Sequence, residues 1–386
     1  MIDAASDPDW ARLAALFERL ADMPADAREQ ALLELQDEPD SARLLPRLRA
    51  LLAAHAREDV DLSQGGAAER LALDVAGADP TQLSSALHSG DAIGPWTLLR
   101  PLGEGGMGEV WLAERHLESV QQQAALKRIR AGLGPELKSR FLRERRILAR
   151  LKHPHIAAFI DAGLDAEGAP WMAMEYVEGE RLHEHCARLQ LDPRARVGLI
   201  LQVLEALDHA HRQLVVHRDL KPGNVMVDAE GRVKLLDFGI ARLLDDSEVD
   251  AALTRTRAPA PLTPRYAAPE QLAGEPVGIA ADLYSAGLLL FELLSGRSPF
   301  GESAGSMTAR ESPDSLWRAY TRADGAAHYT IGESALRRQL RGDLQQILQR
   351  ALQPQPGARF PSAAAFAEDL RAWREQRPLR SRPTTW

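Results

Sequence analysis

The sequence has one cysteine, Cys186, among 386 residues, and a single thiol excludes an internal disulfide and fits a reducing compartment. The start of the chain has no basic segment followed by an apolar one, and no run approaches the ~18 apolar residues that span a bilayer. The longest apolar stretch, residues 283–294, is interrupted by Ser285, Gly287 and Glu292 and predicts a buried helix. With 45% hydrophobic and 26% charged residues, the composition is that of a soluble globular protein.

Acidic charge is concentrated in the first part of the chain. Residues 1–92 contain 18 acidic and 8 basic residues, a balance of −10, whereas the remainder contains 37 acidic and 39 basic residues, a balance of +2. This distribution does not suggest nucleic-acid binding. Only 5 of the 47 basic residues are lysines, so Lys127 and Lys221, which fall in motifs, stand out from an arginine-rich background.

The first 57 residues predict a small bundle of three helices. Leucines recur there at three- and four-residue spacing between charges, and Pro24 and Pro39 separate the stripes. No cluster of reactive residues occurs, so we interpret this part as a structural appendage or a docking site for a partner. The predicted organisation is an acidic helical domain (1–57), a partly flexible linker rich in Gly, Ala, Ser and Asp (58–92), a main domain (93–375) and a basic tail (376–386).

A polar loop is predicted in the middle of the main domain. Residues 214–216 and 225–227 are apolar and predict two short buried strands, while Pro222 and Gly223 forbid a regular helix or a continuous strand between them. The loop presents a carboxylate, an ammonium group and an amide within six residues, namely Asp219, Lys221 and Asn224.

A second carboxylate, Asp237, follows Asn224 by thirteen residues, and Phe238 and Gly239 come directly after it. Hard divalent cations prefer oxygen ligands, so the Asn224 amide and the Asp237 carboxylate suit a magnesium site.

In the runs His217-Arg218-Asp219-Leu220-Lys221-Pro222-Gly223-Asn224 and Asp237-Phe238-Gly239, the chain resembles the bacterial eukaryotic-like (Hanks-type) protein kinases, and the Lys-Pro-x-Asn form resembles their serine/threonine branch. The resemblance covers roughly residues 93–375. It implies an α+β, two-lobed protein kinase fold, with a β-rich N-lobe (93–175) and an α-rich C-lobe (179–375), preceded by the small all-α domain. It also implies transfer of the ATP γ-phosphate to Ser/Thr hydroxyls of proteins in bacterial signalling, with Mg²⁺ or Mn²⁺.

The glycine-rich run Gly103-Glu104-Gly105-Gly106-Met107-Gly108 matches G-x-G-x-x-G, a pattern that dinucleotide-binding folds share, where a helix follows it. Here residues 110–113 predict a strand, and a strand–loop–strand context favours a lid over the ATP phosphates. By the resemblance, Lys127 contacts the α- and β-phosphates and pairs with Glu144 on a helix predicted over 135–151.

The resemblance also places the adenine of ATP. Residues 171–179 resemble the hinge between the lobes, so that Met174 is the gatekeeper and backbone groups of Glu175 and Val177 bind the adenine edge. The apolar residues expected to sandwich the adenine are Leu102, Val110, Ala125 and Met226.

The same resemblance assigns the chemistry. Asp219 accepts or orients the proton of the acceptor hydroxyl, Lys221 steadies the γ-phosphate, and Asn224 and Asp237 hold the metal. Three supporting contacts are expected: a column of His217, Phe238 and Leu148, a brace from Asp282 to the catalytic loop, and a buried salt bridge between Glu270 and Arg359.

Residues 240–268 correspond to an activation segment. Arg218 beside Asp219 favours a phosphate on this segment, so we predict autophosphorylation at Thr254 and Thr256. Thr263 resembles the threonine that contacts the catalytic aspartate and positions the substrate, although Leu262 replaces the usual preceding glycine.

Other functions fit the sequence less well. A pseudokinase scaffold predicts a missing catalytic residue, and none is missing. Small-molecule phosphotransferases of similar fold lack the Ala-Pro-Glu element that ends at Glu270, and Lys221 with Thr263 disfavours tyrosine specificity. His183, His185 and Cys186 lie close in sequence, and we interpret them as helix surface rather than as a metal site.

Expected partners are protein substrates, the chain itself included, and a transient kinase dimer; nucleic acid is not expected. A cytoplasmic kinase domain is predicted. In similar bacterial kinases a basic stretch like residues 371–386 often leads to a membrane helix, so membrane attachment is expected only if the natural chain continues beyond Trp386.

Overall fold

The structure is a computed structural model, in which the chain divides into two units, Met1–Ala86 and Leu87–Trp386. It describes Leu32, Leu35 and residues 87–105, 108–117, 120–129, 141, 145, 148–238, 265–300, 315–322, 329 and 331–380. Leu32 and Leu35 are buried, and the rest of the helical domain predicted for residues 1–57 lies outside the described residues.

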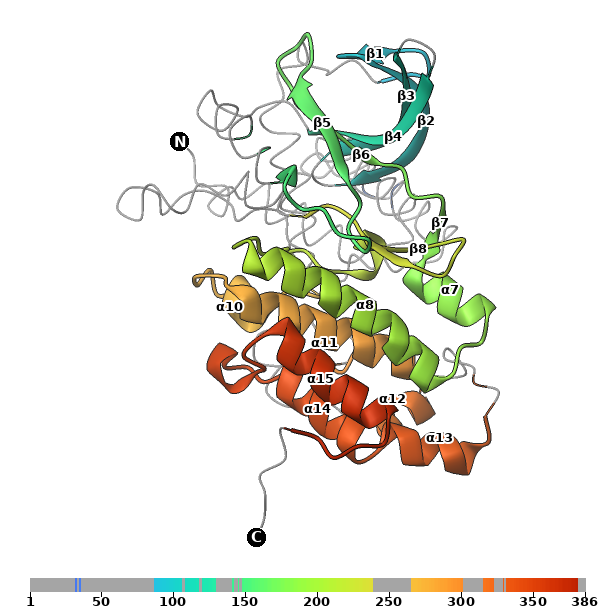
Figure 1. Cartoon of the computed structure of the whole chain (residues 1–386), viewed down its shortest axis with the longest axis vertical. Coiled ribbons are helices and arrows are strands. Elements are labelled where there is room, and N and C mark those ends of the chain that lie inside the picture. The colour runs from blue at the N-terminus through green and yellow to red at the C-terminus, as the bar shows by residue number, and fades with distance from the viewer. Residues whose placement is uncertain are drawn as a thin grey trace. The chain divides into compact units, whose positions relative to one another are not determined.

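Six antiparallel strands form a curled sheet that makes up the N-lobe (Figure 1). The strands are β1 (Ala92–Ile93), β2 (Trp96–Gly105), β3 (Gly108–Leu117), β4 (Val120–Ile129), β5 (Phe159–Leu164) and β6 (Pro170–Glu175), in the order β1-β2-β3-β4-β6-β5. Two register shifts, between Leu98 and Arg100 and between Pro101 and Gly103, interrupt the pairing of β2 with β3. Such irregularities bend a strand, which accounts for part of the curl.

Alternation along β4 separates a core face from a second face. Ala124 and Leu126 are fully buried and pack with Trp96, Trp111 and Trp171 in the N-lobe core. Because successive side chains of a strand point to opposite faces, Ala125 and Lys127 lie on the other face, as the sequence predicts. The sheet thereby holds one lysine away from its aromatic core.

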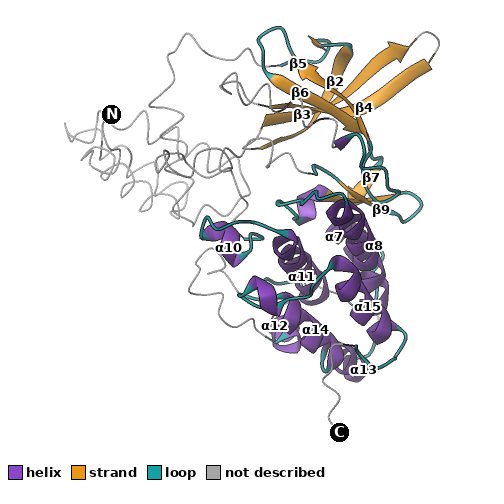
Figure 2. Cartoon of the chain, turned by 60° about the vertical axis from the view of Figure 1, so that its left-hand side comes forward, coloured by secondary structure: helices purple, strands orange, loops and turns teal. Residues whose placement is uncertain are grey.

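The C-lobe is mostly helical, and Figure 2 shows its helices apart from the orange strands of the N-lobe. Its elements are β7 (Gly179–Arg181), α7 (Leu182–Arg188), α8 (Pro193–Arg212), η3 (Pro222–Asn224), β8 (Val225–Asp228), β9 (Val233–Leu235), α10 (Pro269–Leu272), α11 (Ile279–Ser295), α12 (Leu316–Arg322), α13 (Glu333–Leu340), α14 (Asp343–Ala351), η6 (Pro356–Ala358) and α15 (Ala363–Arg374). Strands β7, β8 and β9 form a small antiparallel sheet.

Helix α11 is the buried helix predicted from residues 283–294. Fourteen of its 17 residues are buried. A Cβ built at Gly287 would lie 2.9 Å from the Ala351 Cβ, so glycine allows α14 to approach closely. The helix ends at Gly296, whose left-handed φ of 74° is typical of a C-cap glycine.

The lobes are connected by the chain at residues 176–178 and by direct bonds. Lys234 Nζ lies 2.7 Å from Glu175 Oε1, and backbone bonds of 2.9 Å join Ala157 N to Leu235 O and Leu235 N to His155 O. The predicted α+β, two-lobed arrangement is therefore confirmed.

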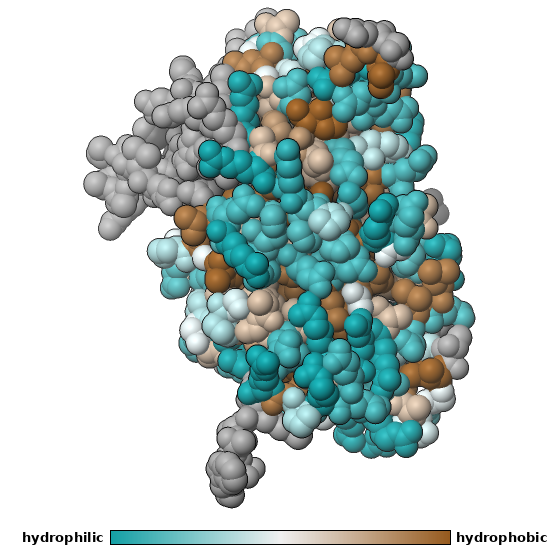
Figure 3. Space-filling view, viewed as in Figure 1, coloured by the Kyte–Doolittle hydropathy of each residue, from teal (hydrophilic) through white to brown (hydrophobic). Residues whose placement is uncertain are grey.

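The ends of the packed domain extend past the predicted boundaries of 93 and 375. Leu87 packs against the N-lobe core, and Leu379 is buried in the C-lobe core. Hydrophilic residues cover much of the face shown in Figure 3, and apolar residues are scattered between them. Among the described residues, no helix has both the length and the apolar character to cross a membrane.

Candidate active site

The loop that carries Asp219 leaves helix α8 through a left-handed turn. Leu214 has a φ of 60°, its amide donates to His211 O (3.0 Å), and the Val215 amide donates to Ala210 O (3.0 Å). These bonds form a Schellman arrangement that satisfies the last carbonyls of the helix. The strand predicted over residues 214–216 is therefore wrong, because a left-handed residue interrupts the extended backbone that a strand needs.

Asp282, buried in α11, braces the catalytic loop as predicted. Its Oδ2 accepts a hydrogen bond from the His217 amide, its Oδ1 accepts one from the Arg218 amide, and Oδ2 also contacts His211 Nε2, all at 2.8 Å. Burial disfavours the Asp282 carboxylate, but its interactions with His211 and then His217 outweigh burial and lower its pKa. Arg218 has a φ of 67°, so the carboxylate fixes a strained backbone beside Asp219.

The ring of His217 ties this loop to the segment that carries Asp237. It is fully buried, it lies 4.6 Å from the Phe238 ring between centroids, and its Nε2 is 3.0 Å from Leu236 O. Leu148, the third member of the predicted column, is buried in the same hydrophobic core.

Asp219 lies between Lys221 and Asn224. Lys221 Nζ is 2.9 Å from Asp219 Oδ2, and Asn224 Nδ2 donates to the Asp219 carbonyl (2.8 Å) and, more weakly, to Oδ2 (3.3 Å). Because the amide nitrogen of Asn224 is bound to Asp219, its amide oxygen points away as a candidate metal ligand. The side chains of Asp219 and Lys221 are 14% and 31% exposed, so a substrate can reach them.

Lys127 pairs directly with Asp237, although 110 positions separate them in the sequence. Lys127 Nζ lies 2.6 Å from Asp237 Oδ2, and the side chains are 9% and 20% exposed. Asp237 has a φ of 58°, a second non-glycine residue held in a strained conformation at this site. The Leu236 amide donates to Asn224 O at 2.9 Å, so the Lys127 pair adjoins the Asp219 cluster.

The oxygen ligands available at this site suit a divalent cation that a bound substrate also coordinates. In the described part of the chain, no three His, Cys, Asp or Glu side chains group as a complete metal site. Asn224 and Asp237 would contribute an amide and a carboxylate oxygen, and magnesium commonly takes one or two protein ligands together with phosphates.

The glycine-rich run connects two strands, which argues against a dinucleotide-binding loop followed by a helix. Strand β2 ends at Gly105 and β3 begins at Gly108. Gly108 has a φ of 138°, and a Cβ there would lie 1.9 Å from Arg128 O, so no other residue fits. At Gly103 a Cβ would meet nothing within 4 Å. Glycine at position 108 is therefore required by the sheet itself.

The residues predicted around adenine are all partly exposed, neither buried in a core nor open on the surface. They are Leu102, Val110, Ala125, Met174, Glu175, Val177 and Met226. Ala125 pairs with Met174 across β4 and β6, and Val110 pairs with Gly103 across β2 and β3. The Glu175 amide donates to Ala158 O (2.8 Å), so this amide is already bonded within the protein.

Several predicted site residues lie outside the described part of the structure. Nothing is described of Gly106, Met107, Glu144, Thr254, Thr256 and Thr263, or of the side chain of Glu104. Their roles stay predictions.

The interpretation of His185 and Cys186 as helix surface is wrong. Both are buried on α7, which packs against β7 and β8, and only His183 is exposed. His185 Nδ1 lies 2.8 Å from Glu180 Oε1, and burial raises the pKa of the Cys186 thiol to about 11.

Two further buried polar contacts involve the neighbouring residues Glu270 and Gln271. Arg359 binds Glu270 through both guanidinium branches, at 2.7 and 2.8 Å, as predicted. Gln271 was not predicted: its Nε2 donates to Arg218 O (2.8 Å) and its Oε1 accepts from the Ala268 amide (2.9 Å). Only its position after Glu270 could have indicated this role.

Residues 96–370 match the family described as "Protein kinase domain". The chain is 37% identical over 286 residues to the probable serine/threonine-protein kinase SCO3848 of Streptomyces coelicolor. This alignment covers 72% of the chain and 40% of the Streptomyces protein. It is 40% identical over 236 residues to the probable serine/threonine-protein kinase PknB of Bifidobacterium longum, and this alignment covers 58% of the chain and 33% of the Bifidobacterium protein.

The fold is similar to the crystal structure of the Mycobacterium tuberculosis PknI kinase domain. The TM-score is 0.55 with 30% sequence identity, and the match covers 75% of this chain and all of that one. The chain thus matches a whole solved kinase domain, but it spans only a third to two-fifths of the length of the two curated relatives.

Proposed function

The chain belongs to the protein kinase family, and from this premise we propose that it transfers the γ-phosphate of ATP to serine and threonine hydroxyls of proteins in bacterial signalling. Members of the family use ATP and a divalent metal ion. The observation that carries the proposal is the contact of Lys127 with Asp237 next to the cluster of Asp219, Lys221 and Asn224.

In the proposed reaction, the acceptor hydroxyl attacks the γ-phosphorus, the bond to the bridging oxygen of ADP breaks, and the hydroxyl proton passes to Asp219. Lys221 already lies against the Asp219 carboxylate and would neutralise charge on the transferred group. Lys127 would exchange part of its contact with Asp237 for the α- and β-phosphates. Because the loop and Asp237 are fixed by neighbouring groups, little reorganisation is needed.

Asn224 and Asp237 would hold Mg²⁺ or Mn²⁺, which neutralises the phosphate charge when bound. The glycine-rich run, with Gly103, Gly105 and Gly106, would cover the phosphates. Met174 would be the gatekeeper, and the carbonyl of Glu175 and the amide of Val177 would bind the adenine edge. The partial exposure of the seven predicted adenine residues supports this placement.

Regulation is proposed from the resemblance. Glu144 would pair with Lys127, Thr263 would position the acceptor, and phosphates on Thr254 or Thr256 would be bound near Arg218. A transient dimer would let one copy phosphorylate the activation segment of another, and the N-terminal helical domain would dock a partner.

The test compares wild type with Asp219→Asn, using γ-labelled ATP, Mg²⁺ and a mixture of acceptor proteins. Transfer to serine and threonine, reduced at least ~10²-fold in the variant, is expected because the proton acceptor is lost. Glu230→Gln, which removes an exposed carboxylate of the same lobe, is the matched control and should keep wild-type activity. Equal transfer by Asp219→Asn, or label on tyrosine alone, would refute the proposal.

A further inference from the structure

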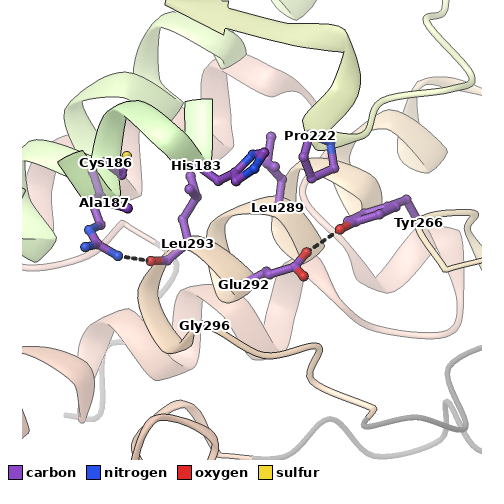
Figure 4. Close-up of a pocket in the computed structure, with 10 residues that line it drawn as sticks. His183, Cys186, Ala187, Pro222, Tyr266, Leu289, Glu292, Leu293 and Gly296 are labelled. Atoms are coloured by element: carbon purple, nitrogen blue, oxygen red, sulfur yellow. Dashed lines mark hydrogen bonds between the residues drawn. The ribbon is translucent and has the colours of Figure 1, made fainter. Parts of the chain in front are cut away.

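A second pocket of the C-lobe lies apart from the catalytic loop. One pocket, of about 340 Å³, includes Pro222 of the catalytic loop among its lining residues (Figure 4). The second, of about 910 Å³, shares none of those lining residues. It lies along α13, which Figure 1 and Figure 2 show at the end of the C-lobe away from the strands of the N-lobe. A ligand bound there would leave the active site open.

Helix α13 and the turn before α14 form the lining of this second pocket. The helix contributes Glu333, Ser334, Arg337 and Arg338, and the turn contributes Arg341 and Gly342. All six residues are exposed. Residues four apart on a helix lie on one face, so positions 333 and 337, and 334 and 338, are neighbours. We call Arg337, Arg338 and Arg341 the pocket arginines.

The other face of α13 is anchored in the C-lobe core, which fixes the helix that carries the pocket arginines. Leu336 and Leu340 are 2% and 0% exposed and belong to the core. Arg337 lies over the Trp317 ring, with 5.7 Å between its Cζ and the ring centroid. Such a cation–π contact restricts the side chain and leaves its positive charge available to a ligand.

The pocket has an excess of positive charge that the protein does not neutralise. Within the part of the chain that the structure describes, no carboxylate forms an ion pair with a pocket arginine. By contrast, Arg232 Nε lies 2.9 Å from Asp228 Oδ2. Glu333 is the carboxylate of the lining, so three arginines and one glutamate give the lining a net charge of +2. The pocket therefore favours an anion as its ligand.

The arrangement of the arginines suits a phosphate group better than a carboxylate. A guanidinium presents a planar fork of N–H donors, and a phosphate monoester offers three acceptor oxygens and a charge of about −1.5 to −2 at pH 7. Helix residues three or four apart have Cβ atoms about 5–6 Å from each other, so one phosphate can contact two of these long side chains. A carboxylate has a single charge and two oxygens, which one guanidinium fork already satisfies.

We propose that the pocket arginines form a docking site for a phosphoserine or phosphothreonine of a protein substrate, at a distance from the acceptor residue. The inference rests on the proposed kinase function, because the group that the enzyme transfers is then the group that this pocket binds. A substrate that already carries one phosphate is held there while a second hydroxyl reaches Asp219. The favoured substrate class is therefore proteins with several serine or threonine acceptor sites.

The first measurement is the binding of fluorescent peptides to the full chain, followed by fluorescence polarisation. Three peptides of one sequence carry phosphoserine, glutamate or serine at the same position. The phosphoserine peptide should bind about tenfold more tightly than the other two, because only phosphate engages two arginines at once. Binding should weaken as NaCl is added, since exposed charges are screened by salt.

Variants of the pocket arginines assign the binding to this pocket. Arg338→Ala combined with Arg341→Ala changes two exposed residues and should reduce the affinity for the phosphoserine peptide to that for the serine peptide. Lysine at both positions keeps the charge without the planar fork and should keep only part of the preference. The matched control is Arg374→Ala, at an exposed position of α15 outside the pocket, which should bind like wild type.

Kinetics connect the docking site to the reaction. In a second peptide series, a flexible Gly/Ser spacer of increasing length joins an acceptor serine to a phosphoserine or to an alanine. At the spacer length that reaches both sites, the phosphoserine peptide should have a KM about tenfold lower and the same kcat, because docking raises the local concentration of the acceptor. The double alanine variant should lose this difference in KM and keep kcat for the alanine series.

The outcomes separate the two proposals. Equal binding of the three peptides, binding of the glutamate peptide as tight as that of the phosphoserine peptide, or wild-type binding by the double alanine variant refutes the docking site and leaves the kinase function standing. Binding of phosphatidylserine vesicles or of single-stranded RNA through the pocket arginines, without phosphopeptide binding, also refutes it. Absence of transfer to every protein and peptide refutes the kinase function and, with it, the role of the pocket in substrate selection, whatever the polarisation assay shows.

Discussion

Replacing Asp282 with asparagine should damage both stability and catalysis, because one buried carboxylate holds the catalytic loop. Asn has the same shape but only one acceptor oxygen, so its NH₂ group must face either the Arg218 amide or the His217 amide and His211. A hydrogen bond to a charged group contributes ~1.5–3 kcal/mol, and an unpaired buried donor costs ~1–3 kcal/mol. We therefore expect the free energy of unfolding to fall by about 3–5 kcal/mol.

The same change should slow phosphoryl transfer. The left-handed conformation of Arg218 costs ~1–3 kcal/mol, and without the second backbone bond the loop can relax and displace Asp219. A displacement of ~1 Å can reduce kcat ~10²-fold. The KM for ATP should change little, because Lys127 and Asp237 keep their contact.

Urea denaturation and steady-state kinetics, at a temperature where both proteins are folded, measure the two effects. The control is Asp369→Asn: Asp369 is equally buried, in α15, and accepts only the Arg380 amide (3.0 Å) among the contacts described. It should lose less stability and keep kcat. A kcat for Asp282→Asn within threefold of wild type, with a stability loss below about 1 kcal/mol, would refute the bracing role.

Three further predictions concern other parts of the kinase domain. Arg359→Lys loses the two-branched contact with Glu270 and should lower the free energy of unfolding by about 3–5 kcal/mol in urea titrations. Burial, followed by the charge of His209, lowers the pKa of His153 below 6.5, so the unfolded state binds more protons than the folded state as the pH falls. The stabilising contribution of neutral His153 is therefore present above pH 6.5 and is lost at lower pH. His153→Gln should make the midpoint of urea denaturation depend less on pH. Leu214→Gly should raise stability by up to ~1 kcal/mol in thermal unfolding, because glycine tolerates the left-handed turn.

The sequence predicts which side chains come together better than it predicts the backbone conformation around them. Asp219, Lys221, Asn224 and Asp237 were predicted from motifs that resemble those of protein kinases, and the structure brings Lys221 and Asn224 against Asp219 and Lys127 against Asp237. The turn at Leu214 was not predicted, because leucine carries no signal for a left-handed φ.

The burial of some side chains also could not be predicted from the sequence. Cys186 and His185 fall on a short polar helix, whose inner face is defined only when it packs on β7 and β8. A cavity of about 340 Å³ in the C-lobe is lined by residues of five separate segments, including α7, α8, α11 and the loop at Pro222, and no single sequence pattern brings them together.

The backbone at Gly108 affects how mutations in the glycine-rich run should be interpreted. An alanine scan is a common way to ask whether such a loop binds nucleotide, and it assumes that every glycine serves the same purpose. Alanine at 108 would force apart two paired strands, so lost activity there would reflect a damaged sheet. At Gly103 a methyl group would meet open space, so a loss of activity there would test the proposed contact of this run with the ATP phosphates.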